Sequence, residues 1–172
     1  HNYKQFEETF KNARDVGFDN INVDLMIGLP NQTFDDVKDS VKKIIDLKPE
    51  HISVYSLILE EGTPLEKMVK ENKLEMLSDE EERKMYWYVK VMLEKHKYYQ
   101  YEISNFARPG FESVHNSDCW KQKEYIGIGA AASSFLEDKR YSNIQDLEQY
   151  IENIEKGTSN KNMGKRIFAH RL

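Results

Sequence analysis

The sequence predicts an α/β fold over residues 1–60 and an α+β region after it, and three observations support this. Apolar, β-branched runs at Ile21–Ile27 and His51–Ile58 have the length and composition of strands. Amphipathic helical patterns precede the first run and separate the two. Beyond residue 60, helices and short strands follow one another less regularly. Because a helix between two such strands is typical of a βαβ unit, we expect both strands to be buried and parallel.

The two helices of the first region have recognisable ends. Apolar residues recur at three- and four-residue spacing over Tyr3–Val16, and Gly17 is suited to end that helix. A second helix is predicted over Phe34–Leu47, where Thr33 and Asp36 form the pattern of a capping box.

The second region contains three predicted helices, a strand, a long loop and a hairpin. In chain order we expect a short helix capped by Thr63 and Pro64, a long helix from Ser78 to about Lys97 with Met85, Val89, Met92 and His96 on one stripe, a strand over Tyr98–Ser104, a loop over Asn105–Lys123, a small-residue segment over Tyr125–Leu136, a turn at Glu137 and Asp138, and a helix capped by Ser142 and Gln145. Loops as long as the predicted one are usually functional or mobile.

The composition excludes several classes of protein. The chain has 172 residues, a formal net charge of −5 and 12% aromatic residues, which argues for a folded protein without affinity for nucleic acids. No stretch approaches the roughly 20 apolar residues of a membrane-spanning helix. With Cys119 as the single cysteine, no disulfide framework can form, which is consistent with the cytoplasm. Because the chain opens at His1 without methionine and ends at Leu172 in a helical pattern, we expect a fragment of a longer protein.

An acidic residue, Asp24, interrupts the apolar run of the first strand. Burying a carboxylate is costly unless it is paired or hydrogen-bonded. In parallel α/β folds, ligands bind at the carboxyl ends of the strands. Asp24 is therefore a candidate acceptor of hydrogen bonds from a ligand hydroxyl or amine. The alternatives are a carboxylate that points outward and one that pairs with a lysine.

A second candidate site lies in the predicted loop, where His115 and Asn116 precede Trp120. A neutral imidazole can ligate a metal ion or haem iron, and a tryptophan can pack on a flat macrocycle. The alternative is a surface loop with an incidental histidine. Cys119 could be a thiolate ligand, although a thiol without basic neighbours is more often inert.

A run of small residues, 127–134, forms the third candidate. A flat ligand could lie against such a backbone, and tight packing between strands is the alternative. The run lacks the spacing of a dinucleotide-binding fingerprint. The spacing of the five histidines predicts no zinc site.

Taken together, these segments resemble the oxygen-independent coproporphyrinogen III oxidase family of radical S-adenosylmethionine (SAM) proteins. The second half of the chain is similar to its haem-chaperone (HemW-like) branch. The segments that carry the resemblance are Asn22–Thr33, His51–Leu57, Tyr101–Gly110, His115–Trp120 and Tyr125–Gly129.

The resemblance implies that residues 1–60 are the last two βα units of a partial (β/α)6 radical SAM barrel and that residues 61–172 are a family-specific extension. Asp24 matches a residue in polar contact with SAM, and the backbone of Ile58 matches a position beside the adenine. Ser133 matches a contact to a second ligand. His115, Asn116 and Trp120 match a haem-linked pattern, with His115 as the possible iron ligand.

The resemblance also implies partners and cofactors. In the intact protein these would be SAM, a [4Fe–4S] cluster, haem or a porphyrin, and haem-accepting proteins. The chain departs from the family pattern in three ways: it lacks the three cysteines of the cluster motif, Cys119 stands where the branch usually has tyrosine, and Ser133 where it usually has histidine. We therefore expect the chain alone to be inactive as an enzyme, because reductive cleavage of SAM needs an electron from the cluster.

Two other functions stay open at this point. One is the oxidative decarboxylation of coproporphyrinogen, and the other is a non-catalytic haem-binding module. Since the strand at Ile21–Ile27 would lack one barrel neighbour, we expect the chain to self-associate, or to cover that strand's edge with its own helix or terminal segment.

Overall fold

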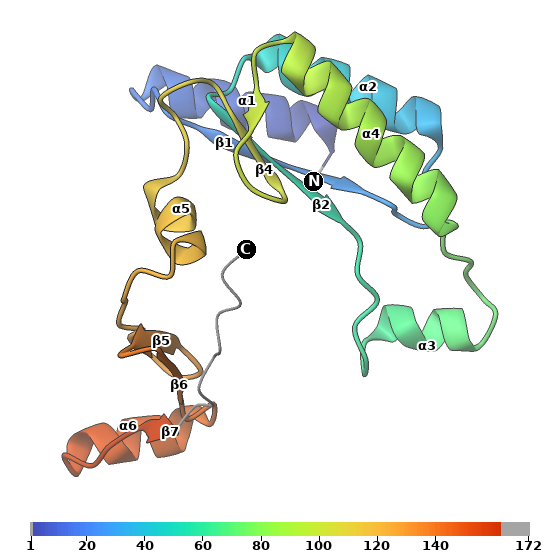
Figure 1. Ribbon diagram of the computed structural model, residues 1–172. Coiled ribbons are helices and arrows are strands. Elements are labelled where there is room, and N and C mark those ends of the chain that lie inside the picture. Colours follow the sequence, from blue (N-terminus) through green and yellow to red (C-terminus); the bar gives the residue numbers. More distant parts are fainter. Residues whose placement is uncertain (1, 163–172) are drawn as a thin grey trace. The chain divides into compact units, whose positions relative to one another are not determined.

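The computed structural model describes residues 2–162 of the chain. It contains two compact units, of which unit 1 ends at Glu112 and unit 2 begins at Ser113, and each has its own sheet (Figure 1). The elements of unit 1 are α1 (Tyr3–Asp15), β1 (Asn22–Ile27), α2 (Phe34–Leu47), β2 (His51–Ser56), α3 (Pro64–Lys70), α4 (Asp79–Lys95), β3 (Tyr99–Gln100) and β4 (Asn105–Ala107).

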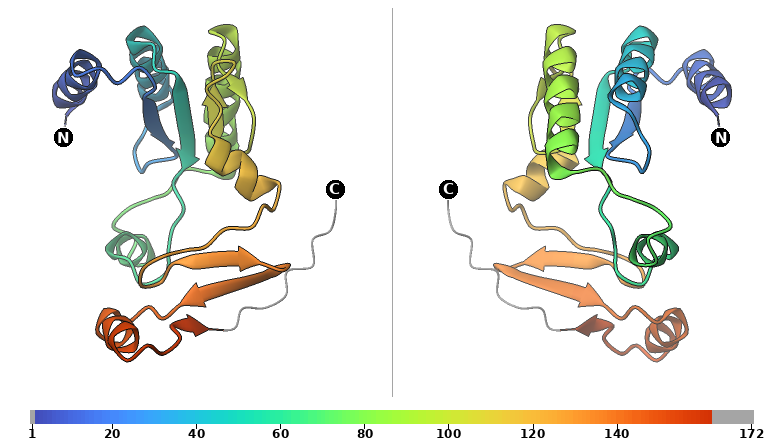
Figure 2. Two further views of the ribbon diagram at one scale, coloured as in Figure 1. Left: turned by 90° about the vertical axis from the view of Figure 1, so that its left-hand side faces the viewer. Right: turned by 90° about the vertical axis from the view of Figure 1, so that its right-hand side faces the viewer.

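The sheet of unit 1 has the strand order β1-β2-β4-β3. β1 and β2 are parallel, in a register that runs from Asn22 beside His51 to Ile27 beside Ser56. This confirms the predicted parallel pair, and the views in Figure 2 show the two strands next to each other. β4 joins β2 in the antiparallel sense. Within this sheet β1 is an edge strand, because it pairs only with β2.

The helices begin where local hydrogen bonding favours them. Asn2, Thr33 and Ser78 each form a capping box, in which the side chain accepts a bond from the third helical residue and the reciprocal bond is also made. Each box satisfies backbone N–H groups that a helix end leaves free. The observed bounds of α2 are those predicted from the sequence, and Lys48 ends the helix in the left-handed conformation.

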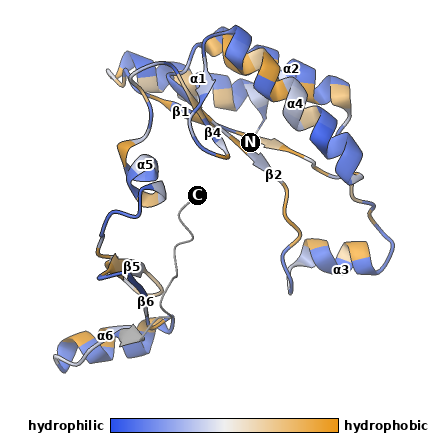
Figure 3. Ribbon diagram, viewed as in Figure 1, coloured by the Kyte–Doolittle hydropathy of each residue, from blue (hydrophilic) through white to orange (hydrophobic). Residues whose placement is uncertain are grey.

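The hydrophobic core lies between one face of the sheet and helices α2 and α4. Alternate residues of β1 from Val23 to Ile27 are buried, whereas Asn22, Asp24 and Met26 are exposed. Figure 3 shows the mixed polar and apolar colouring of α2 and α4, as expected of helices with one buried side. The prediction that β1 is buried is therefore wrong for one of its faces.

The segment after α4 differs from the prediction. The strand expected over Tyr98–Ser104 contains only β3, and the loop expected over Asn105–Lys123 contains β4 and the helix α5. The reason is a sharp reversal between β3 and β4, which pair with each other. On α4, Leu93 is buried, whereas His96 lies exposed at the C-cap and not on the buried stripe.

The described part of unit 2 combines two helices with an antiparallel sheet of order β5-β6-β7. Its elements are α5 (Val114–Trp120), β5 (Ser133–Leu136), β6 (Lys139–Asn143), α6 (Leu147–Glu155) and β7 (Lys161–Asn162). Glu137 and Asp138 connect β5 to β6, which confirms the predicted hairpin. The predicted cap of the last helix is wrong: Ser142 lies in β6, and Asp146 caps α6. The helix expected at the C-terminal end lies outside the described residues.

Candidate functional site

The carboxylate of Asp24 lies on the face of the unit 1 sheet opposite α2 and α4. We call this the helix-free face, and it carries Asn22 and Asp24 of β1 and His51 and Ser53 of β2. Asp24 is exposed, in agreement with the alternative of an outward-pointing side chain. It sits in the middle of β1, and its Oδ1 accepts a hydrogen bond of 2.7 Å from Nδ2 of Asn22.

Asn22 connects Asp24 to residues that the sequence analysis did not single out. Its Oδ1 lies 2.6 Å from Nδ1 of His51 and accepts a bond of 3.1 Å from Oγ of Ser53. On the other side of the imidazole, Nε2 lies 2.7 Å from the hydroxyl of Tyr101. The ring of Tyr101 also packs edge-on against that of His51.

The bonding pattern assigns the tautomer of His51. Because Asn22 uses its amide nitrogen toward Asp24, its oxygen is the acceptor, and Nδ1 of His51 must carry the proton. Nε2 of the neutral ring then accepts from the Tyr101 hydroxyl. Burial lowers the pKa of His51, while the charges of Glu102, Asp24 and Glu112 act in the opposite direction. The neutral ring is therefore the form that the fold favours.

The free energy of unfolding is expected to fall as the pH drops below about 6.5, the ordinary pKa of histidine. Folding lowers the pKa of His51 below its ordinary value, so on acidification the unfolded chain binds a proton first. The stability present above pH 6.5 is therefore lost progressively as the pH falls toward the pKa of His51 in the folded chain. Thermal unfolding between pH 5 and 8 measures the effect. His51→Gln should flatten the pH dependence and His96→Gln, at an exposed histidine, should not; equal slopes for wild type and His51→Gln would refute the assignment.

Asn105 of β4 also lies on the helix-free face. It pairs in register with Ser53, which itself pairs with Asp24. Its side chain is 6% exposed, and its Oδ1 has no hydrogen-bond partner among the described residues. This oxygen is therefore an unsatisfied acceptor. A buried polar atom in that state costs about 1–3 kcal/mol.

Ile58 lies just beyond the carboxyl end of β2. The N–H of Leu57 donates to the carbonyl of Ile27, which extends the β1–β2 ladder by one residue before the chain leaves the sheet. The side chain of Ile58 is 76% exposed. Asp24 thus lies within β1, and Ile58 lies two residues past the end of the neighbouring strand β2.

The residues of the second candidate site lie on α5 in unit 2, a helix and not the predicted loop. His115 and Cys119 are one helical turn apart and both exposed, with Nε2 and Sγ separated by 3.8 Å. Trp120 is 58% exposed at the end of the helix. The backbone N–H of Asn116 donates to Oγ of Ser113, the N-cap residue, so Asn116 also belongs to the cap of this helix.

Tight packing explains part of the small-residue run. A Cβ atom on Gly127 would lie 2.1 Å from the carbonyl oxygen of Ser133, so no side chain fits at that position. Ser133 itself begins β5 and is partly buried. Asn143 donates from Nδ2 to the carbonyl of Gly129, which holds the run against β6. These contacts agree with the packing alternative for Gly127.

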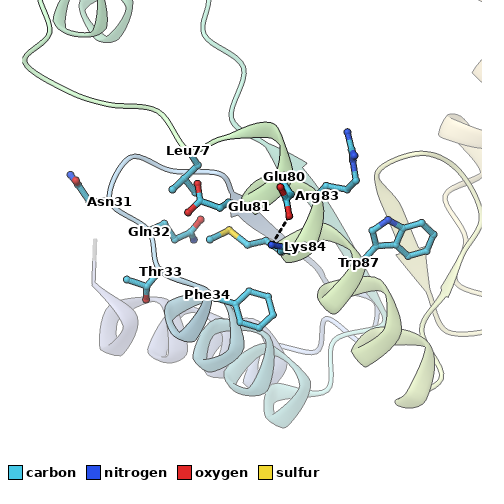
Figure 4. Close-up of a pocket in the computed structure, with 11 residues that line it drawn as sticks. Asn31, Gln32, Thr33, Phe34, Leu77, Glu80, Glu81, Arg83, Lys84 and Trp87 are labelled. Atoms are coloured by element: carbon cyan, nitrogen blue, oxygen red, sulfur yellow. Dashed lines mark ion pairs between the residues drawn. The ribbon is translucent and has the colours of Figure 1, made fainter.

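Unit 1 also has a cavity of about 890 Å³ between the β1–α2 turn and the first turns of α4 (Figure 4). Phe34 and Trp87 supply apolar surface, and Glu80 and Lys84 form an ion pair at its rim. None of the site residues predicted from the sequence lines this cavity.

Two features are not found among residues 2–162. No helix there is long and apolar enough to cross a membrane. No three side chains of histidine, cysteine, aspartate or glutamate come together there as ligands of a metal ion.

The fold of this chain matches part of one solved structure. The solved structure of coproporphyrinogen III oxidase (HemN) from Escherichia coli, a radical SAM enzyme, superimposes on this chain with a TM-score of 0.74. The match covers 98% of this chain and 41% of that chain at 19% sequence identity. No family model matches the sequence.

Sequence relatives identify the branch. The haem chaperone HemW of Bacillus subtilis is 40% identical over 158 residues, which cover 91% of this chain and 42% of the relative. HemW of Lactococcus lactis is 40% identical over 151 residues, or 88% of this chain and 40% of the relative. The mitochondrial radical S-adenosyl methionine domain-containing protein 1 of Danio rerio is 32% identical over 178 residues, or 100% of this chain and 40% of the relative. The chain belongs to the HemW-like family of radical SAM proteins, and it spans about two fifths of the length of these relatives.

Proposed function

We propose that this chain is part of a haem chaperone, a protein that binds haem and transfers it to haem-accepting proteins in the cytoplasm. The sequence identity to HemW proteins supports this function. The observation that carries the proposal is the exposed imidazole of His115 on α5, with the exposed ring of Trp120 at the end of the same helix. An accessible imidazole can ligate haem iron, and an indole can pack on the porphyrin.

We propose that the intact protein also binds SAM in a partial (β/α)6 barrel. Residues 1–60 would be the last two βα units of that barrel, and residues 61–172 the family-specific extension that follows it. Asp24 fits a role in holding SAM, because its exposed carboxylate has one oxygen fixed by Asn22 and can still accept hydrogen bonds. Ile58 would lie beside the adenine, and Ser133 would contact a second ligand. SAM supplies radical chemistry when it is bound in such proteins.

The residues of this chain do not fit a [4Fe–4S] cluster. Such a cluster is held by several cysteine thiolates, and the chain has one cysteine, Cys119. We therefore assign no ligand of the cluster, and no enzymatic activity, to this chain by itself.

Coproporphyrinogen oxidation is the second candidate function. The structural likeness to HemN favours it, but that likeness at 19% identity concerns the fold. The identity to HemW proteins, which extends over α5, favours the chaperone.

The edge of β1 could also serve association. Within the described residues this strand pairs on one side only, and no strand pairs with its other side. We propose that a second strand, from another copy of the chain or from a longer chain, occupies that side.

Hemin titration tests the haem-binding proposal. Hemin added to the purified chain is expected to shift and sharpen its Soret absorption, and His115→Ala should lose this change because the iron ligand is gone. His96→Ala is the matched control: His96 is exposed as well, but it lies in unit 1 and bonds to the carbonyl of Met92.

Two results would count against haem binding at α5. One is a wild-type spectrum equal to that of free hemin. The other is an unchanged titration of His115→Ala. Because Sγ of Cys119 lies 3.8 Å from Nε2 of His115, the double variant His115→Ala, Cys119→Ser decides the second case: an unchanged titration of this variant too excludes α5 as the ligand, whereas a loss only in the double variant shows that the thiol replaces the imidazole.

A further inference from the structure

Three strands of unit 1 bring a row of polar side chains to the helix-free face. The register places Asp24 of β1 beside Ser53 of β2, and Ser53 beside Asn105 of β4. Residues directly opposite one another on neighbouring strands project from the same face of a sheet. The row therefore crosses three strands that are far apart in the sequence, and none of its members takes part in the apolar core.

The buried oxygen of Asn105 gives this row one unsatisfied acceptor. The side chain is more than nine-tenths buried, and its Oδ1 has no partner among the described residues. Buried side-chain oxygens in native proteins are nearly always satisfied, by protein groups, water or a bound molecule. A ligand that donates a hydrogen bond at this position would satisfy it.

A chain of hydrogen bonds fixes the neighbouring carboxylate. Tyr101 donates to His51, His51 donates to Asn22, and Asn22 donates to Oδ1 of Asp24, over donor–acceptor distances of 2.7, 2.6 and 2.7 Å. The bond from Asn22 to Asp24 fixes the direction of the bond from His51 to Asn22, which in turn fixes the bond from Tyr101 to His51, so Oδ1 of Asp24 is held at one end of a connected chain. Its second oxygen is left to accept from a ligand.

The charge around this row favours a cation. The carboxylates of Asp24, Glu102 and Glu112 all act on His51 electrostatically, while burial lowers the pKa of His51 and so favours its uncharged form. A positively charged ligand on the helix-free face would meet negative charge from β1 and from the segments before and after β4.

We propose that Asn105 contacts the ligand that Asp24 binds, and that Asn22, His51 and Tyr101 are positioning residues for Asp24. The ligand class is a cationic small molecule that donates hydrogen bonds. This inference rests on the proposed function, in which the ligand is SAM: its sulfonium and ammonium groups are positive, and its ribose hydroxyls and amines are donors.

Equilibrium dialysis with labelled SAM tests the inference on the purified chain. Asn105→Leu removes the free acceptor at similar volume, and it should weaken SAM binding about tenfold, the loss of one hydrogen bond. The midpoint of thermal unfolding should not fall, because Oδ1 has no partner to lose. Adenosine, which lacks the positive charges, should bind more weakly than SAM to the wild type.

Tyr101→Phe tests the positioning role. It keeps the ring that packs on His51 but removes the donor to Nε2. The variant should bind SAM less tightly, and NMR titration should show a changed pKa of His51. A merely structural role of the hydroxyl would not change the SAM affinity and the pKa of His51 together. Tyr99→Phe on β3, where the tyrosine is exposed, is the matched control.

The outcomes separate this inference from the proposed function. If the wild type binds SAM and both Asn105→Leu and Tyr101→Phe bind it equally well, the inference is wrong and the SAM proposal stands. If Asn105→Leu lowers the unfolding midpoint without weakening SAM binding, Asn105 is structural and the inference is also wrong. If the wild type binds no SAM, both the SAM proposal and the inference fail, while the haem proposal at α5 is unaffected.

Discussion

Replacing Glu50 with alanine is expected to lower the free energy of unfolding by about 3 kcal/mol, because it leaves a partly buried guanidinium without its carboxylate. Nη2 of Arg14 lies 2.6 Å and 2.8 Å from the two carboxylate oxygens of Glu50. One of these oxygens also accepts from the backbone N–H of Ile21 at 3.0 Å. The contact therefore connects α1 with the residues just before β1 and β2.

Urea denaturation measures this loss, and a surface ion pair provides the control. Glu7→Ala removes a solvent-exposed i, i+4 pair with Lys11 and should cost less than about 1 kcal/mol. Arg14 also donates to the carbonyls of Phe18 and Lys48, so part of its bonding survives in Glu50→Ala. A cost for Glu50→Ala no greater than that for Glu7→Ala would contradict the assigned role.

Phe106→Ala is expected to cost about 4 kcal/mol, the range for a large buried aromatic residue. Phe106 is 0% exposed in the middle of β4, where it belongs to the core cluster. Its removal leaves a cavity beneath the strand that joins β2 to β3. Phe111→Ala, outside the strand and exposed, is the control and should change stability little. A loss below about 2 kcal/mol would show that the site collapses around the smaller side chain.

The sequence predicts unit 1 well as far as β2, since the signals there are local. Thr33 and Asp36 form the capping box that marks the start of α2, and the apolar runs mark β1 and β2. The failure begins at Tyr98. β4 has three residues, too few to show a period, and it forms because Asn105 and Phe106 pair with β2 some fifty residues earlier. No local pattern contains that pairing.

The candidate site shows the same division. Asp24 is conspicuous in the sequence because it interrupts an apolar run. The residues that orient it are not, since His51 lies 29 residues from Asn22 and 50 residues from Tyr101. One signal was available: Asn22 and His51 lie within one residue of the starts of the two predicted parallel strands, and the observed register places them side by side. The partner Tyr101 needed the β3–β4 reversal, which the sequence did not reveal.

The turn between β5 and β6 determines where local unfolding of unit 2 is expected to begin. Glu137 and Asp138 have φ values of 49° and 58°, a backbone region that glycine, asparagine and aspartate tolerate and that glutamate disfavours. Cross-strand pairing of Ser133–Leu136 with Lys139–Ser142 must offset that cost. Fraying is therefore expected to start at this tip, and an endoprotease specific for acidic residues should nick the folded chain there before it reaches the glutamates of α6.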